Sequence, residues 1–133
     1  MPGETNISEL LKGMNPKLNK GEYVFSTVRD LNIINRNDTL CEFKEKDGTT
    51  VIIDRKKADE LQLKYTYVAS WITLMIHSSL EAVGLTAQFS TELAKNYISC
   101  NIIAGYYHDH IFVDKKDADK AIQVLKELAK KHS

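Results

Sequence analysis

The chain has 133 residues, of which 43% are hydrophobic, and its 18 basic and 18 acidic side chains give a formal net charge of zero. A chain of this length buries roughly two thirds of its unfolded surface, as one compact domain or as two small fused ones. The neutral charge gives no electrostatic footprint for nucleic acid or for an anionic membrane surface.

Several features of the sequence indicate a cytoplasmic protein. No run reaches the roughly 18 apolar residues that a membrane span needs. The first residues, MPGETNISELL, lack the basic and apolar segments of a secretory signal. Cys41 and Cys100 lie far apart and form no CxxC motif, which favours a reduced chain over a disulfide or a zinc site.

The first 65 residues predict an α/β subdomain built from short elements. A helix is expected at Ile7–Lys12, because Asn6 can cap its start and Gly13 can end it. The other expected elements are, in chain order, a strand at 22–28, a polar loop at 29–39, a hairpin of strands 40–46 and 49–54 around Asp47-Gly48, and a short basic helix at 55–61 capped by Asp54.

Residues 66–133 predict the order β-α-β-β-α. The strand at Val68–Ile76 is apolar on both alternating faces, as expected where a sheet is covered on both sides. From Gly84 onward the spacing changes, because Leu85, Phe89 and Leu93 recur every four residues and form one face of a helix.

Two more strands and a helix follow. Alternation from Cys100 to Tyr107 predicts a strand, His108-Asp109 a tight turn, and residues 110–113 the antiparallel return. The last helix carries an apolar stripe made of Ala118, Ala121, Ile122, Leu125, Leu128 and Ala129. This half therefore predicts a ferredoxin-like unit that lacks its final strand.

The segments WITLMIHSSLEAVGLTAQFS and ISCNIIAGYYHDHIFV resemble the ACT domain, and more closely a family of small uncharacterised bacterial proteins with ACT-type domains. The resemblance implies an α+β, ferredoxin-like antiparallel sheet with helices on one face. Residues 66–133 would form the ACT-type domain. Residues 1–65 would form a smaller N-terminal subdomain, interpreted as a degenerate ACT-like copy.

ACT domains are usually regulatory modules that bind amino acids, so the resemblance implies a cytoplasmic, non-catalytic regulatory protein without a cofactor. The loop from His77 to Leu85 is the expected carboxylate site, because backbone N–H groups at a helix N-terminus suit an anion. Val83-Gly84 stands where many ACT loops carry Pro-Gly. The expected ligand-binding residues are His77, Ser78, Ser79, Val83, Gly84, Leu85, Asn101, Ile102 and Gly105.

Three alternatives stay open. His108 and His110 are spaced to share a metal if they lie on one strand face, but a turn between them would remove that alignment. His77-Ser78-Ser79 contains a base and a nucleophile without the elbow or the acid of a hydrolase. The chain can also be an ACT-type structural or interaction module that has lost its ligand.

A homodimer is expected, since the sheet face that carries Trp71 and Met75 needs a cover.

Overall fold

The computed structural model describes residues 6–77 and 80–132, and its contacts divide the chain into two compact units. The smaller unit is Lys20–Ser70, and the larger unit joins the residues up to Asn19 to those from Trp71 onward. The helices are α1 (Ile7–Lys12), α2 (Arg55–Glu60), α3 (Leu85–Lys95) and α4 (Ala118–Lys131), with 3-10 turns η1 (Leu31–Ile33), η2 (Arg36–Asp38) and η3 (Lys115–Asp117). The strands are β1 (Pro16–Leu18), β2 (Tyr23–Val28), β3 (Thr39–Glu45), β4 (Gly48–Asp54), β5 (Val68–Leu74), β6 (Asn101–Ala104) and β7 (Asp109–Asp114). None of the helices in the described ranges is long and apolar enough to cross a membrane.

The larger unit has the strand order β6-β7-β5-β1 within its described residues. Three of these strands follow one another in the C-terminal half, in the predicted order with α3 and α4 between and after them. The fourth is β1, which pairs antiparallel with β5 through Pro16 opposite Leu74 and Leu18 opposite Ile72. If β1 is counted last, the order is that of a ferredoxin-like sheet.

The missing final strand of the C-terminal half is therefore supplied from the N-terminus of the chain. This strand was not predicted, because three residues are too few to show a strand period. The short helix α1 follows the same division. Its bounds and its Asn6 cap were predicted correctly, since the Asn6 side chain accepts a hydrogen bond from the Glu9 N–H at 3.1 Å. However, α1 packs with the C-terminal elements and not with residues 20–65.

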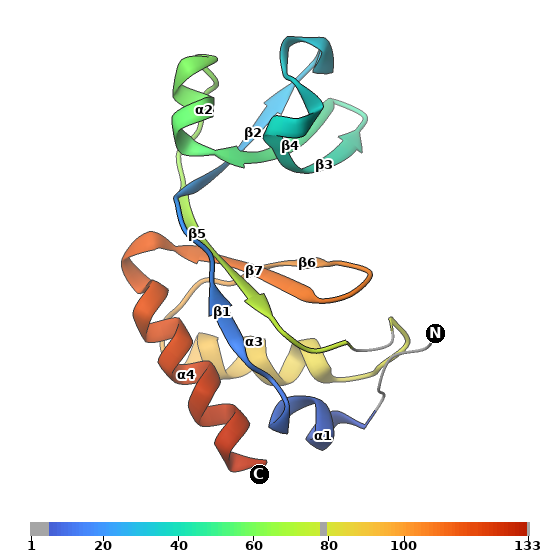
Figure 1. Ribbon diagram of the computed structural model, residues 1–133, viewed down its shortest axis with the longest axis vertical. Helices are drawn as coiled ribbons and strands as arrows, with labels where there is room; N and C mark the ends of the chain where they lie inside the picture. The colour runs from blue at the N-terminus through green and yellow to red at the C-terminus, as the bar shows by residue number, and fades with distance from the viewer. Residues whose placement is uncertain (1–5, 78–79, 133) are drawn as a thin grey trace. The chain divides into compact units, whose positions relative to one another are not determined.

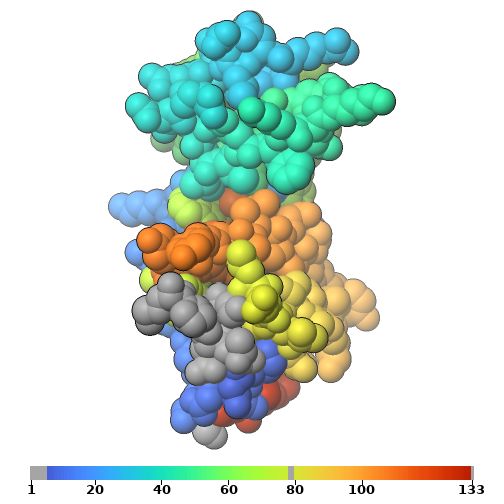
Figure 2. Space-filling model, turned by 90° about the vertical axis from the view of Figure 1, so that its right-hand side faces the viewer, coloured from blue at the N-terminus to red at the C-terminus, as the bar shows by residue number. Residues whose placement is uncertain are grey.

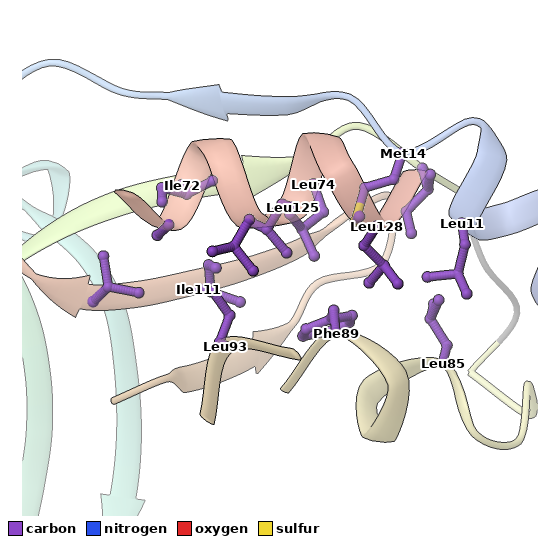
Figure 3. Packing of buried hydrophobic residues seen from close by; sticks show 14 of the residues in the cluster. Leu11, Met14, Ile72, Leu74, Leu85, Phe89, Leu93, Ile111, Leu125 and Leu128 are labelled. Carbon is purple, nitrogen blue, oxygen red and sulfur yellow. The ribbon is translucent and has the colours of Figure 1, made fainter. Parts of the chain in front are cut away.

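The three helices of the larger unit cover one face of its sheet (Figure 1). Between them lies a continuous core to which α1, β5, α3, β7 and α4 contribute, and Figure 3 shows its side chains pointing toward one another. Its members include Leu11 and Met14 from the N-terminal segment, Ile72 and Leu74 from β5, Leu85, Phe89 and Leu93 from α3, Ile111 from β7, and Leu125 and Leu128 from α4. The predicted apolar face of α3 is therefore confirmed.

The smaller unit repeats the same strand order. Its sheet runs β3-β4-β2-β5, with Val24 opposite Val68 and Val24 opposite Ile53. In place of a helix between its first two strands it has the turns η1 and η2. A separate core of valine and isoleucine side chains lies under α2. Residues 68–70 of β5 close this sheet, and residues 71–74 of the same strand belong to the larger unit.

Both hairpins turn one or more residues away from the predicted positions. Glu45 pairs with Gly48, so Lys46 and Asp47 form the first turn. Ala104 pairs with Asp109, so the second loop is residues 105–108 and not His108-Asp109. The Gly105 N–H closes that loop by donating to the His108 carbonyl at 3.0 Å. The alternating pattern of side chains continues through Tyr106 and Tyr107, so the predicted strand ran past Ala104, where β6 ends.

We predict that Leu11→Ala destabilises the larger unit far more than Leu18→Ala does. Leu11 is fully buried among the helices, whereas 43% of Leu18 is exposed. Loss of a buried leucine side chain costs about 2–5 kcal/mol, and loss of an exposed one about 0.5 kcal/mol. Denaturant unfolding measures the difference. Hydrogen exchange should show lost protection in α3 and α4 and unchanged protection in β3 and β4. Equal effects of the two variants would contradict the assignment of the N-terminal segment to this unit.

Candidate functional site

Three segments of the larger unit meet at one end of its sheet: the end of β5, the start of α3, and the loop between β6 and β7 (Figure 1). Figure 2 looks onto this end and shows the surface of the hairpin loop beside the segment that leads into α3. A hydrogen bond of 3.2 Å from His108 Nδ1 to the Ile76 carbonyl joins the loop to the end of β5. The chain thus brings His77, Gly84 and Gly105 to the same end of one unit.

Gly84 provides the backbone geometry at the start of α3. It is the N-cap residue in a left-handed conformation, with φ of 93° and ψ of −9°, which glycine adopts without the steric cost that a Cβ brings. A Cβ built on it would meet nothing within 4 Å, so the space beside this residue is open. The first N–H groups of a helix have no intrahelical acceptor and carry the positive end of the helix dipole. This junction is therefore suited to an anionic group.

Aromatic rings gather at the same end of the unit. The His77 ring centroid lies 6.4 Å from that of Tyr106 and 6.1 Å from that of Tyr107, and the two tyrosine rings meet edge to face at 5.1 Å. Both tyrosines are about two thirds exposed, at 66% and 67%. The sequence did not place them among the ligand-binding residues, because their alternation indicated a strand. The signal that could have found them is the glycine directly before them, which permits a tight loop.

Gly105 is required by close packing. A Cβ at this position would lie 2.7 Å from the His108 carbonyl oxygen and 3.2 Å from atoms of the His110 ring. The loop therefore folds closely over His110, and any larger residue would push it away. The predicted importance of Gly105 has a structural basis here, while its contact with a ligand stays a prediction.

His110 lies on the face of the sheet opposite the helices, in a polar network that links β5, β7 and the residue after β1. The Trp71 Nε1–H donates to His110 Nδ1 at 3.0 Å, and Thr73 Oγ1 lies 3.2 Å from the same nitrogen. Asn19 Nδ2 donates to Thr73 Oγ1 at 3.0 Å and to the Trp71 carbonyl at 3.2 Å. Because the indole N–H can only donate, His110 Nδ1 must be unprotonated, and the neutral ring carries its proton on Nε2.

The pKa of His110 is lowered from its ordinary value. Burial is the main cause, a positive charge on His108 adds to it, and the carboxylate of Asp109 opposes it. Protonation of Nδ1 would set two donors against each other at the Trp71 contact.

The alternative of a metal site at His108 and His110 finds little room, because each of these side chains has one ring nitrogen in a hydrogen bond to a protein group. Over the described ranges no three His, Cys, Asp or Glu side chains are grouped so as to hold a metal ion.

The other sequence-predicted residues are distributed as follows. Ser78 and Ser79 lie outside the described residues. Val83 is 86% exposed next to Gly84, and Leu85 is buried in the core. Asn101 lies at the far end of β6 opposite Phe112, about 10 Å along the strand from Ala104 at the usual rise per residue. Ile102 packs partly against the helix-side core. The structure therefore does not bring these two residues to the end that carries His77.

The smaller unit contains a second candidate, a cavity of about 400 Å³ at the start of α2, lined by Gly21, Glu22, Asp54, Arg55, Lys56 and Asp59. Three of its charged groups, on Glu22, Arg55 and Asp59, already have partners. The Arg55 guanidinium pairs with Glu22 at 2.9 Å and donates to Tyr65 Oη at 3.2 Å, and Tyr65 in turn donates to Asp59 at 2.7 Å. These contacts hold β2, α2 and the following segment together. The cavity is therefore a weaker candidate for a ligand than the end of the larger unit.

Comparison with known families agrees with the fold. The profile of the ACT domain matches residues 2–70, and a second ACT-domain profile matches residues 67–127. The two matches meet at the start of β5, the strand that is used by both units. No match was found among proteins of curated function.

Solved structures give the same picture. A Vibrio cholerae protein of unknown function, described as a possible transport protein, is 45% identical over 92% of this chain and 94% of its own, with a TM-score of 0.80. An Agrobacterium tumefaciens protein is 14% identical, with a TM-score of 0.69 over 87% of this chain and 89% of its own. The ligand-free regulatory subunit of aspartate kinase from Thermus thermophilus is 6% identical, with a TM-score of 0.60 over 85% and 95%. The last two show likeness of fold.

We predict that the free energy of unfolding decreases as the pH is lowered below about 6.5, and that His110→Asn removes this decrease. Because the folded pKa of His110 is lowered, its contribution to stability is complete above the unfolded value of about 6.5 and is lost as the pH falls from there toward the folded pKa. The loss is at most about 1.4 kcal/mol per pH unit for one group. Trp71 is the sole tryptophan, so its fluorescence reports the broken contact directly.

The asparagine variant keeps an acceptor near the position of Nδ1 but does not titrate. Its tryptophan emission should equal that of the wild type at pH 7.5 and stay constant down to pH 5. A wild-type emission that is also constant over this range would show that the contact between Trp71 and His110 does not respond to protonation.

Proposed function

Because the chain belongs to the ACT-domain family, we propose that it is a non-catalytic regulatory protein that binds an L-amino acid at the end of its larger unit. The observation that carries this proposal is the Gly84 junction, an open helix N-terminus at the same end of the unit as the rings of His77, Tyr106 and Tyr107. The ligand carboxylate would receive hydrogen bonds from the first N–H groups of α3. His77, Tyr106 and Tyr107 would contact the ligand side chain.

Binding at this place would connect segments from two layers of the fold. The start of α3 belongs to the helical layer, and the loop at 105–108 belongs to the sheet. A ligand that contacts both favours whichever arrangement brings them closer, and the shift is set by the difference in its affinity for the two arrangements. The fold likeness to the aspartate kinase regulatory subunit supports a regulatory role by analogy.

A second candidate function is protein interaction without a small ligand. The exposed tyrosines at the hairpin loop favour it, because aromatic side chains are enriched at protein interfaces. In that case the same end of the unit would contact a partner protein directly. The two functions differ in one respect that can be measured, namely whether a free amino acid stabilises the fold.

We predict that at least one of the twenty L-amino acids raises the melting temperature of the wild type and that Gly84→Val removes this shift. A ligand at a hundred times its dissociation constant adds about 2.7 kcal/mol. For a chain of this size the melting temperature should then rise by roughly 5–15 °C. Valine fits the open space but not the positive φ.

Gly84→Asn is the matched control, because asparagine tolerates the left-handed conformation and should keep the shift. An unchanged shift in the valine variant would place the ligand elsewhere. A wild type that no amino acid stabilises would reject ligand binding and leave the interaction function.

We also predict a homodimer in solution. The strand order leaves β6 at the edge of the larger unit's sheet, and 40% of Met75 is exposed at the end of β5. Trp71, by contrast, is held by its bond to His110 and needs no partner chain as a cover. Light scattering should give twice the 15.1 kDa mass of the chain at micromolar concentration. A mass of one chain throughout the micromolar range would contradict the prediction.

A further inference from the structure

Asp109 is a buried carboxylate at the end of the sheet where the candidate site lies. It is the first residue of β7, directly after the hairpin loop. His110 faces the side of Trp71, whereas Ile111 and Val113 face the helices and belong to the core. Because successive side chains of a strand point to opposite faces, Asp109 lies on the helix side together with Ile111. A hairpin aspartate is ordinarily exposed, but only 8% of this residue is accessible.

The carboxylate has no compensating partner in the described part of the chain. No hydrogen bond or ion pair of the Asp109 side chain is found there, while its backbone pairs with Ala104 of β6. Burial raises the pKa of this carboxyl, and the charges of His110 and His108 oppose the rise. An ionised carboxylate that is taken out of water without hydrogen bonds costs stability. A residue kept at such a cost is a candidate for a functional role.

Two observations place this carboxylate at the same end of the unit as the start of α3. The neighbouring His108 donates to the carbonyl of Ile76, which ties the beginning of β7 to the end of β5. Ile76 and Leu85, the first residue of α3, are both buried in the core cluster on the helix side. The hairpin loop, the end of β5 and the start of α3 all lie at the same end of the unit (Figure 1). One end of the unit therefore carries a carboxylate without a side-chain partner among residues 6–77 and 80–132, together with the positive end of an eleven-residue helix.

We propose that Asp109 is a receptor for a protonated primary amine and that, resting on the proposed function, it holds the α-ammonium group of the bound amino acid. The carboxylate would accept charge-assisted hydrogen bonds from the ammonium, while the α3 N-terminus holds the ligand carboxylate. The negative Asp109 carboxylate and the positive N-terminus of α3 would then face the ammonium and the carboxylate of the ligand, respectively. The ammonium partner is thus the Asp109 side chain at the start of β7.

The test compares the wild type, Asp109→Asn and Asp114→Asn in thermal-shift and calorimetric titrations. Asp114 ends the same strand and accepts a hydrogen bond from the Lys116 N–H at 3.0 Å, so it is a partnered carboxylate far from the site. The probes are the twenty L-amino acids, their methyl esters, which keep the ammonium and lose the carboxylate charge, and the deaminated acids, which keep only the carboxylate.

We expect Asp109→Asn to melt about 2–5 °C above the wild type without ligand, because it removes a buried charge. We expect its dissociation constant for the amino acid to rise by at least tenfold. The deaminated acid lacks the ammonium group, so Asp109→Asn and the wild type should bind it with the same dissociation constant. Asp114→Asn should bind as the wild type does. An Asp109→Asn protein that is less stable than the wild type would assign Asp109 a structural role and overturn the proposal.

The remaining outcomes separate this proposal from the proposed function. If amino acids bind the wild type and Asp109→Asn equally well, the regulatory function stands and the role of Asp109 is rejected. If methyl esters bind the wild type through Asp109 but no amino acid does, the amine receptor stands and the amino-acid function is rejected. If none of the probes binds the wild type, both are rejected.

Discussion

The pairing of β1 with β5 is the constraint on which the larger unit depends. Without it, β5 would be an edge strand of this sheet, and the apolar side chains of α1 would have no core to join. With it, β5 is fixed between β1 and β7. The position of β5 then determines where the carbonyl of Ile76, two residues after the strand ends, can hold His108, and hence where the hairpin loop and Asp109 lie. A pairing made by residues 16–18 thus supports a site formed by residues 76–109.

The two faces of that sheet perform different tasks. The helix side is a dry core of leucine, isoleucine and phenylalanine side chains that gives the unit its stability. The other side carries the bonds among Asn19, Thr73, Trp71 and His110, which are directional and fix one arrangement of the strands. Asp109 is the exception, because it is a charged group on the apolar side. Its burial without a partner among the residues that the structure describes is a local conflict of the kind expected where binding and not stability determines the residue.

Regular elements with a clear period or cap could be predicted from the sequence. The four-residue spacing of Leu85, Phe89 and Leu93 identified the buried face of α3, and Asn6 with Gly13 set both ends of α1. Features that depend on distant partners could not be predicted. Three residues show no strand period, so β1 became visible only through its pairing with β5. Nor does a sequence show that α1 packs against helices more than 70 positions away.

The candidate site divides in the same way. A glycine before an amphipathic helix was sufficient to predict the Gly84 junction. The chosen strand residues Asn101 and Ile102 lie away from it, because the alternation continued through the loop and placed the hairpin turn too late. The same displacement made Asp109 a turn residue in the prediction, whereas the structure makes it the buried start of β7. A one-residue change in strand position moves a side chain to the opposite face, and here it decides the chemistry of the site.

The most direct test of this account is a crystal structure of the protein with the amino acid that stabilises it most. The account predicts density between the start of α3 and the start of β7, with the ligand carboxylate at the N–H groups after Gly84 and its ammonium about 2.8 Å from the Asp109 carboxylate. A ligand bound in the smaller unit beside Arg55 and Glu22, with the end of the larger unit unchanged, would contradict it.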